Sequence, residues 1–203
     1  MKQLPSPSAI LRQHALRAKH SWGQNFLGDE QMLTRIVEAL DPFAGEAVIE
    51  LGAGLGHLTA ALLEAGARLT AVERDRDLVR LLEEWDHPRL RVVAANAAAL
   101  DFSKVAEAPK VAVIGNLPFH LTTPILFEVL RQRASVSRAV FTLQKEVAER
   151  LAASPGGRDY GILPVRLGLH YWLEQLFTIP ASLFYPAPKV DAALVRLTPL
   201  PKA

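Results

Sequence analysis

The first residues suited to chemistry form a glycine-rich segment at positions 50–56, with the sequence ELGAGLG. Glycine permits sharp turns and lets the backbone approach a ligand closely, so this spacing between a strand and a helix favours a nucleotide-binding turn. His57 stands where the dinucleotide fingerprint G-x-G-x-x-G requires its third glycine, which disfavours NAD. The alternative is a glycine turn with a purely structural role.

Two side-chain acceptors follow the glycine turn along the chain. Glu73 lies 21 residues after Gly52, at the end of the next strand, where its carboxylate can accept hydrogen bonds from both hydroxyls of an adenosine ribose. Asn96 follows the third strand and can reach an adenine, although asparagine is also a common turn former. No lysine that could bind a phosphate is near, so the pattern favours S-adenosylmethionine, an adenosine without phosphates.

A third pattern, Asn116-Leu117-Pro118-Phe119, is suited to holding the exocyclic amino group of a flat base. Adenine N6 is a poor nucleophile because its lone pair is delocalised into the ring. The Asn116 side-chain oxygen and the Leu117 carbonyl, held by the following proline, can bind the N6 hydrogens and favour a pyramidal nitrogen. Phe119 can stack on the extruded base. Methyl transfer then depends on in-line placement and electrostatics, with no compulsory general base.

Alternating strand and helix patterns are expected to place these residues at one edge of a sheet. Short apolar, β-branched segments indicate strands, and apolar residues at helical spacing indicate the helices between them. The strands are expected at 48–51, 69–72, 90–93, 111–114 and 139–143, and the helices at 57–64, 76–85, 123–130 and 144–151. This alternation predicts a Rossmann-like α/β fold with a mostly parallel seven-stranded sheet and helices on both faces.

Both ends of the chain depart from this alternation. A short helix is expected over 9–18, followed by an aperiodic segment and a helix capped by Asp29. After a helix over 160–170, two strands at 172–179 and 192–197 have no helix between them, so they should form an antiparallel hairpin at a sheet edge. The segment Pro155-Gly156-Gly157 is expected to be a mobile loop.

The composition excludes several chemistries. The length of 203 residues suits one α/β domain. Because the chain has no cysteine, it can form no disulfide, thiolate zinc site, cysteine nucleophile or iron–sulfur cluster, and we expect no metal site. It contains no apolar run of about 18 residues and no hydrophobic signal core, so we expect a cytoplasmic protein.

Charge is distributed unevenly along the chain. Residues 1–28 hold four basic side chains and no acidic one, residues 29–130 hold 16 acidic and nine basic ones, and residues 131–170 hold seven basic and three acidic ones. Basic segments around an acidic middle favour a surface that meets a polyanion. The alternative is that these charges only solvate helix faces.

Together these patterns resemble the ribosomal RNA adenine N6,N6-dimethyltransferases of the bacterial kasugamycin-resistance type, along nearly the whole chain. The matching segments are GQNFL at 23–27, ELGAG at 50–54, VERD at 72–75, NLPF at 116–119, QKEVA at 144–148 and FYPAPKV at 184–190. The resemblance implies a class I methyltransferase fold, with residues 1–28 as a basic helix and cofactor-covering segment and residues 29–203 as the catalytic domain. Members of the family normally continue into a C-terminal helical domain, which this sequence is expected to lack.

The resemblance also implies site residues. Phe184 would form the second face of the base pocket, opposite Phe119. Asn96 stands where the family usually has aspartate, and Phe119 where tyrosine is common, so a charge and a hydroxyl are lost. The cofactor-binding residues so implied are Gln24, Asn25, Leu27, Gly52, Gly54, Glu73, Asn96 and Asn116.

The implied reaction is dimethylation of two adjacent adenosines near the 3′ end of small-subunit (16S) ribosomal RNA, in four successive transfers. Its partner would be that RNA or a 30S precursor particle, and the protein is expected to be a monomer. One alternative is an erythromycin-resistance-type methylase of large-subunit RNA, which the segment 144–151 disfavours. Another is a noncatalytic ribosome-assembly or RNA-binding factor, which intact Asn116 and Glu73 disfavour. A DNA adenine methylase or a small-molecule N-methyltransferase fits the basic flanks less well.

Overall fold

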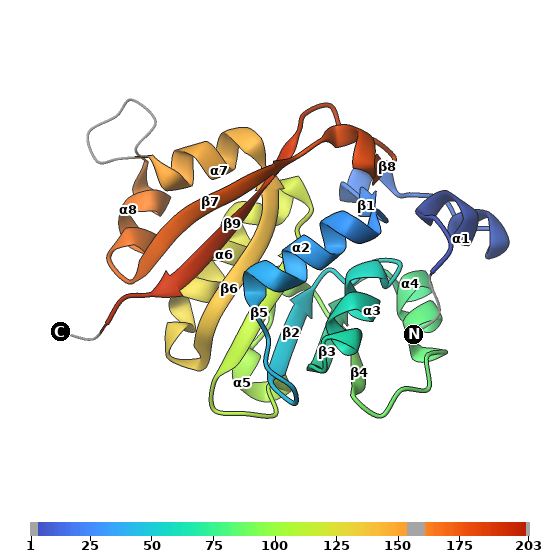
Figure 1. Cartoon of the computed structure of the whole chain (residues 1–203), viewed down its shortest axis with the longest axis horizontal. Coiled ribbons are helices and arrows are strands. Elements are labelled where there is room, and N and C mark those ends of the chain that lie inside the picture. Colours follow the sequence, from blue (N-terminus) through green and yellow to red (C-terminus); the bar gives the residue numbers. More distant parts are fainter. Residues whose placement is uncertain (1–3, 154–160, 202–203) are drawn as a thin grey trace.

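A seven-stranded sheet forms the centre of the computed structural model, which describes residues 4–153 and 161–201. The strands lie in the order β4-β3-β2-β5-β6-β9-β7 (Figure 1). Strands β2 to β6 are parallel, whereas β9 is antiparallel to both β6 and β7. Their bounds are β2 Ala47–Leu51, β3 Arg68–Glu73, β4 Leu90–Ala94, β5 Val111–Asn116, β6 Val136–Gln144, β7 Tyr171–Ile179 and β9 Ala192–Pro199.

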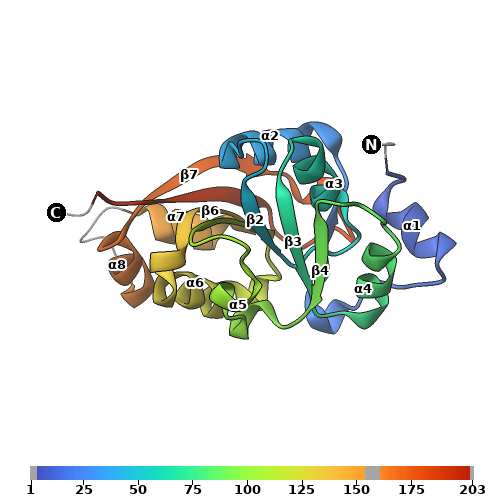
Figure 2. The same cartoon turned by 90° about the horizontal axis from the view of Figure 1, so that it is seen from below.

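Helices cover both faces of this sheet, with α2 and α3 on one side and α5 and α6 on the other (Figure 2). The predicted fold class and the C-terminal hairpin at the sheet edge are therefore confirmed. None of the helices in the described residues is long and apolar enough to cross a membrane. The helices are α1 Pro7–Gln13, α2 Glu30–Leu40, α3 His57–Glu64, α4 Arg76–Glu83, α5 Phe102–Val105, α6 Thr122–Arg131, α7 Lys145–Ala152 and α8 Ile162–Gly168.

The core explains why β5 is apolar without interruption from Val111 to Ile114. Alternate residues of a strand face opposite sides of a sheet, and here both sides are covered by helices. In β5, Ala112 and Ile114 pack with α2 and α3, whereas Val113 packs with α5 and α6. All three side chains are fully buried, so the sheet is held rigidly beneath the polar residues at its carboxyl edge.

A second, two-stranded sheet was not predicted. Strand β1, Phe26–Leu27, pairs antiparallel with β8, Phe184–Tyr185, so that Leu27 stands opposite Phe184. Two residues are too few to give an alternating pattern, and the partners lie far apart in the sequence. This pairing ties the N-terminal segment to the loop between β7 and β9.

The predicted N-terminal helix over 9–18 is too long. The helix begins at Pro7 and ends at Gln13, and Ala15 has a positive φ of 52°. A left-handed residue cannot continue a right-handed helix. The predicted loop at 155–157 and the predicted helix start at Tyr160 lie outside the described residues, and α8 is described from Ile162 onwards.

Gly115 tests how tightly the sheet is packed beneath the site. A Cβ at this position would lie 2.5 Å from the Leu51 carbonyl oxygen of the neighbouring strand. Overpacking a core costs about 1–3 kcal/mol, so Gly115→Ala should lower Tm by roughly 2–12 °C. Differential scanning calorimetry measures this. The control is Gly168→Ala, where the new Cβ would meet no atom within 4 Å apart from its chain neighbours and the backbone of its own helix. Equal Tm values for the two variants would contradict the packing argument.

Candidate active site

The polar residues singled out in the sequence meet in one cleft at the carboxyl edge of the sheet. The glycine turn follows β2, Glu73 ends β3, Asn96 follows β4 and Asn116 ends β5. Since parallel strands end at the same edge, their terminal side chains gather there. The cleft encloses about 860 Å³, its open mouth included. Among its lining residues are Gln24, Asn25, Gly52, Gly54, Glu73, Asn96, Asn116, Leu117, Pro118, Phe119 and Phe184.

Leu27 is the one predicted site residue that does not line this cleft. It lies in β1, is buried, and packs with α2 residues such as Leu33 and Ile36. It lines a smaller neighbouring cavity instead. Direct contact of Leu27 with a cofactor, which the family resemblance implied, therefore stays a prediction.

The glycine turn adopts the conformation that glycine alone adopts without strain. Gly52 and Gly54 have φ angles of 78° and 59°. The Gly52 N–H donates to the Val72 carbonyl at 2.8 Å, and the Gly54 N–H donates to Glu73 Oε2 at 2.9 Å. The turn is thereby held against the end of β3.

The Glu73 carboxylate is buried at the centre of the site and accepts three backbone hydrogen bonds. Besides Gly54, the N–H groups of Arg74 and Asp75 donate to Oε1 at 2.7 and 2.8 Å. Burial raises the pKa of Glu73, and the three N–H groups partly offset this. A carboxylate offers about four acceptor positions, so it can still accept from a hydroxyl group of a ligand.

The lining of the cleft fits an adenosine without phosphates. Its walls are largely apolar, with Leu51, Val72 and Leu78 among them, and no lysine lines it within the described residues. Arg74, a cation among the lining residues, has its guanidinium over the Trp22 ring, 4.7 Å from the ring centroid. The residues present therefore suit S-adenosylmethionine better than a nucleotide with phosphates.

Asn116 is oriented by a backbone group from a distant segment. Its Nδ2 donates to the Asn25 carbonyl at 2.9 Å. Because a carbonyl can only accept, this bond assigns the amide nitrogen to Asn25 and leaves Oδ1 as the acceptor available to a ligand. The Leu117 N–H donates to the Thr142 carbonyl at 3.3 Å, and the buried Leu117 side chain fixes the start of the loop.

Asn96 forms a turn and also lines the cleft, the two possibilities that its sequence position left open. Its Oδ1 accepts from the Ala98 N–H at 3.1 Å and so caps a short 3₁₀ helix, Ala97–Ala99. It also lines the cleft. Asn96 is therefore a turn former at a position from which it can reach a ligand.

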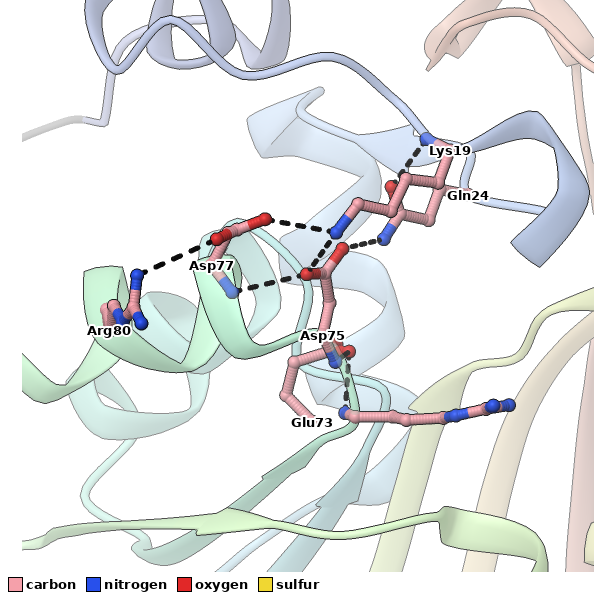
Figure 3. Close-up of polar contacts among 7 residues, drawn as sticks. Lys19, Gln24, Glu73, Asp75, Asp77 and Arg80 are labelled. Atoms are coloured by element: carbon pink, nitrogen blue, oxygen red, sulfur yellow. Dashed lines mark hydrogen bonds and ion pairs between the residues drawn. The ribbon is translucent and has the colours of Figure 1, made fainter.

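We call residues 19–27 the strap. Besides the predicted residues of the strap, Trp22 and Asp75 belong to the site or its surroundings, and the sequence analysis did not single them out. Trp22 lines the cleft and lies beneath two cations, Arg74 and Lys19. Asp75, buried beside the cleft, binds Lys19 and Gln24 (Figure 3). The position of Asp75, two residues after Glu73 and at the start of α4, was visible in the sequence, but its partners lie more than 50 positions away.

Comparison with known proteins identifies the family. The family model for ribosomal RNA adenine dimethylase matches residues 15–203. The chain belongs to this family. Membership confirms the predicted enzyme class, an adenine methyltransferase of ribosomal RNA that uses S-adenosylmethionine.

Individual relatives support the assignment. The ribosomal RNA small subunit methyltransferase A of Myxococcus xanthus is 64% identical over 96% of this chain and 69% of its own length. The protein of the same name from an Anaeromyxobacter strain is 53% identical over 94% of this chain and 71% of its own length.

Solved structures agree with the fold. A dimethyladenosine transferase from Plasmodium falciparum has a TM-score of 0.77 at 26% identity, covering 86% of this chain and 63% of that one. The 23S rRNA methyltransferase ErmE has a TM-score of 0.76 at 29% identity, covering 88% of this chain and 73% of that one.

The buried Glu50 carboxyl should make the stability of the protein depend on pH. Burial raises its pKa to about 8, although Thr59 Oγ1 donates to it at 2.6 Å. The unfolded value is about 4.3, so the folded state binds the proton more tightly, and stability falls as pH rises from 5 to 8. Relative to Glu50→Gln, which cannot ionise, the wild type should lose free energy of unfolding across this window. Urea unfolding at several pH values measures it.

The matched control is Glu83→Gln, which changes an exposed carboxylate on α4 and should follow the wild-type curve. If the free energy of unfolding of the wild type and of Glu50→Gln changed with pH in the same way, the raised pKa of Glu50 would be contradicted.

Proposed function

We propose that this protein methylates N6 of two adjacent adenosines near the 3′ end of small-subunit ribosomal RNA, twice each. The observation that carries this is the orientation of Asn116, whose Oδ1 is left as an acceptor in a cleft that Glu73, Phe119 and Phe184 also line. The substrate is favoured by relatives named for the small subunit, which are 64% and 53% identical. The large-subunit enzyme ErmE is 29% identical.

The cofactor is proposed to lie between the glycine turn and Asn96. Glu73, three of whose acceptor positions are taken by backbone N–H groups, would accept from one ribose hydroxyl, and Asn96 would contact the adenine. Gly52 and Gly54, whose positive φ angles bring the backbone to the cleft, would lie against the methionine part. Gln24 and Asn25 of the strap would cover the cofactor, and Leu27 would support them from β1.

When bound, S-adenosylmethionine supplies an electrophilic methyl group on a sulfonium sulfur. Asn116 Oδ1 and the Leu117 carbonyl would accept from the N6 hydrogens, which localises the nitrogen lone pair and aims it at that methyl group. Both acceptors are fixed beforehand, Asn116 by the Asn25 carbonyl and Leu117 by Thr142. Catalysis would therefore rest on position and electrostatics. The N6 proton leaves after the nitrogen has attacked.

Phe119 and Phe184 are proposed to stack on the two faces of the extruded adenine. They come from segments 65 residues apart, yet both line the cleft. Phe184 is held there by the pairing of β8 with β1. Aromatic side chains hold a flipped base through stacking.

The basic segments 1–28 and 131–170 are proposed to contact the RNA backbone. The physiological substrate would be a 30S precursor particle in the cytoplasm, with the enzyme acting as a monomer. Binding through such contacts should weaken steeply as salt is raised.

Removal of the Asn116 amide tests the catalytic assignment. Asn116→Ala should lower methyl transfer by roughly 10²- to 10³-fold, because a preorganised polar group at the reacting centre is lost. Transfer of labelled methyl groups to small ribosomal subunits that lack the modification measures the rate, and mapping the labelled nucleotides identifies the target.

The control is Asn96→Ala, which should affect cofactor affinity more than the rate at saturating cofactor. Equal rates for Asn116→Ala and the wild type would overturn the mechanism. Label appearing in large subunits instead would overturn the substrate.

Loss of the Glu73 carboxylate tests the cofactor site. Glu73→Ala should raise the Kd for S-adenosylmethionine by roughly 10²-fold, because hydrogen bonds to a charged group contribute about 1.5–3 kcal/mol each. Isothermal titration calorimetry measures the Kd, and Tm shows whether the variant folds. Glu73→Gln keeps one acceptor oxygen, so its Kd for S-adenosylmethionine should lie between those of the wild type and Glu73→Ala. Unchanged affinity in a folded Glu73→Ala variant would refute the ribose assignment.

A further inference from the structure

Residues 22–26 of the strap line the cleft, and one of the side chains that hold the strap, Asp75, takes no part in the proposed chemistry. We propose that Asp75 is a positioning residue for methyl transfer, which holds the strap so that the strap can orient Asn116. This inference rests on the proposed function, because it concerns the step that Asn116 carries out.

The Asp75 carboxylate binds the strap with both oxygens. Lys19 Nζ donates to Oδ1 at 2.6 Å, and Gln24 Nε2 donates to Oδ2 at 2.8 Å (Figure 3). The Lys19 N–H donates in turn to Gln24 Oε1 at 2.8 Å, which closes a ring of hydrogen bonds. The Asp75 side chain is 3% exposed, so water competes little for these bonds.

The electrostatics of Asp75 agree with a permanently charged anchor. Burial alone would raise its pKa, but the hydrogen bonds from Lys19, Gln24 and the Asp77 N–H outweigh this and hold the pKa below its ordinary value. The same ion pair holds the pKa of Lys19 above its ordinary value. Asp77 also accepts from Lys19 at 3.1 Å, but it is 43% exposed and does not reach Gln24.

The anchored strap reaches the reacting centre through its backbone. Asn25 directly follows Gln24, and its carbonyl accepts from Asn116 Nδ2 at 2.9 Å. The Asn25 side chain donates to the Gly23 carbonyl at 3.1 Å, which stiffens the strap at this point. If the carbonyl moved, the Asn116 amide could rotate by half a turn and present its N–H₂ group to the N6 hydrogens, which it cannot bind.

Asp75 also joins the strap to the cofactor site. Its backbone N–H donates to Glu73 Oε1 at 2.8 Å, while its side chain holds Gln24. One residue therefore connects the proposed ribose acceptor with the segment that orients the catalytic amide. Loss of this anchor is expected to affect both cofactor affinity and the chemical step.

The test must separate this role from helix capping, because Asp75 Oδ1 also accepts from the Asp77 N–H at the start of α4. Serine caps helices as well as aspartate does, but it is too short to hold both Lys19 and Gln24. Asp75→Ser is therefore the informative variant. The matched control is Asp101→Ser, which makes the same exchange at the cap of α5, away from the strap.

Two measurements are made on the full chain. Hydrogen exchange of the backbone amides in the strap should become at least tenfold faster in Asp75→Ser, with no such change in Asp101→Ser. With unmethylated small ribosomal subunits and S-adenosylmethionine both saturating, kcat should fall at least tenfold in Asp75→Ser, while the Kd for S-adenosylmethionine rises about tenfold, as for the loss of one hydrogen bond to a charged group.

A double variant adds a second check. Lys19 does not itself line the cleft, and Lys19→Met removes the other end of the ion pair, so its effect on kcat should not add to that of Asp75→Ser. Additive effects would show that the two side chains act separately and would overturn the proposal.

The remaining outcomes are also decisive. If hydrogen exchange of the strap is unchanged in Asp75→Ser, Asp75 does not hold the strap, and the proposal is overturned. A raised Kd with wild-type kcat at saturation also overturns it, because Asp75 would then affect cofactor binding and not the chemical step. A wild-type protein that binds S-adenosylmethionine but methylates no small subunit overturns the proposed function instead.

Discussion

One buried carboxylate organises the site. Glu73 ends β3, and its oxygens accept hydrogen bonds from the glycine turn after β2 and from two consecutive N–H groups that lead into α4. A buried carboxylate without such partners would be costly. The same bonds that satisfy Glu73 therefore fix the conformation of the glycine turn and the position of Asp75, from which the strap is held.

The catalytic edge is assembled from two kinds of structure. The sheet supplies Glu73 and Asn116 on rigid, fully packed strands, where little movement is possible. The strap and the β8 segment supply a cover and an aromatic side chain, and the contacts that hold them include the β1–β8 pair, the Asp75 anchor and the Asn116 amide. The backbone position of Asn116 is thus set by the sheet, while the direction of its amide is set by the strap.

The sequence predicted the main elements because their patterns are local. The buried runs of β2 and β5 and the Asp29 cap of α2 each involve neighbouring residues, and the structure agrees with them. The end of α1 was predicted too late because apolar spacing continues to Leu16, while the backbone turns left-handed at Ala15. The β1–β8 pair could not be predicted, since two-residue strands carry no period.

For the site, the sequence alone determined which groups stand at the ends of the strands, because strand order along the chain and the direction of a parallel sheet are enough to bring Gly52, Glu73 and Asn116 to one edge. Only the tertiary structure decided how those groups are oriented. The direction of the Asn116 amide depends on a carbonyl 91 residues away, and the anchor at Asp75 on a lysine 56 residues away. Contacts of that separation are made by the packing of the whole chain, and no local pattern records them.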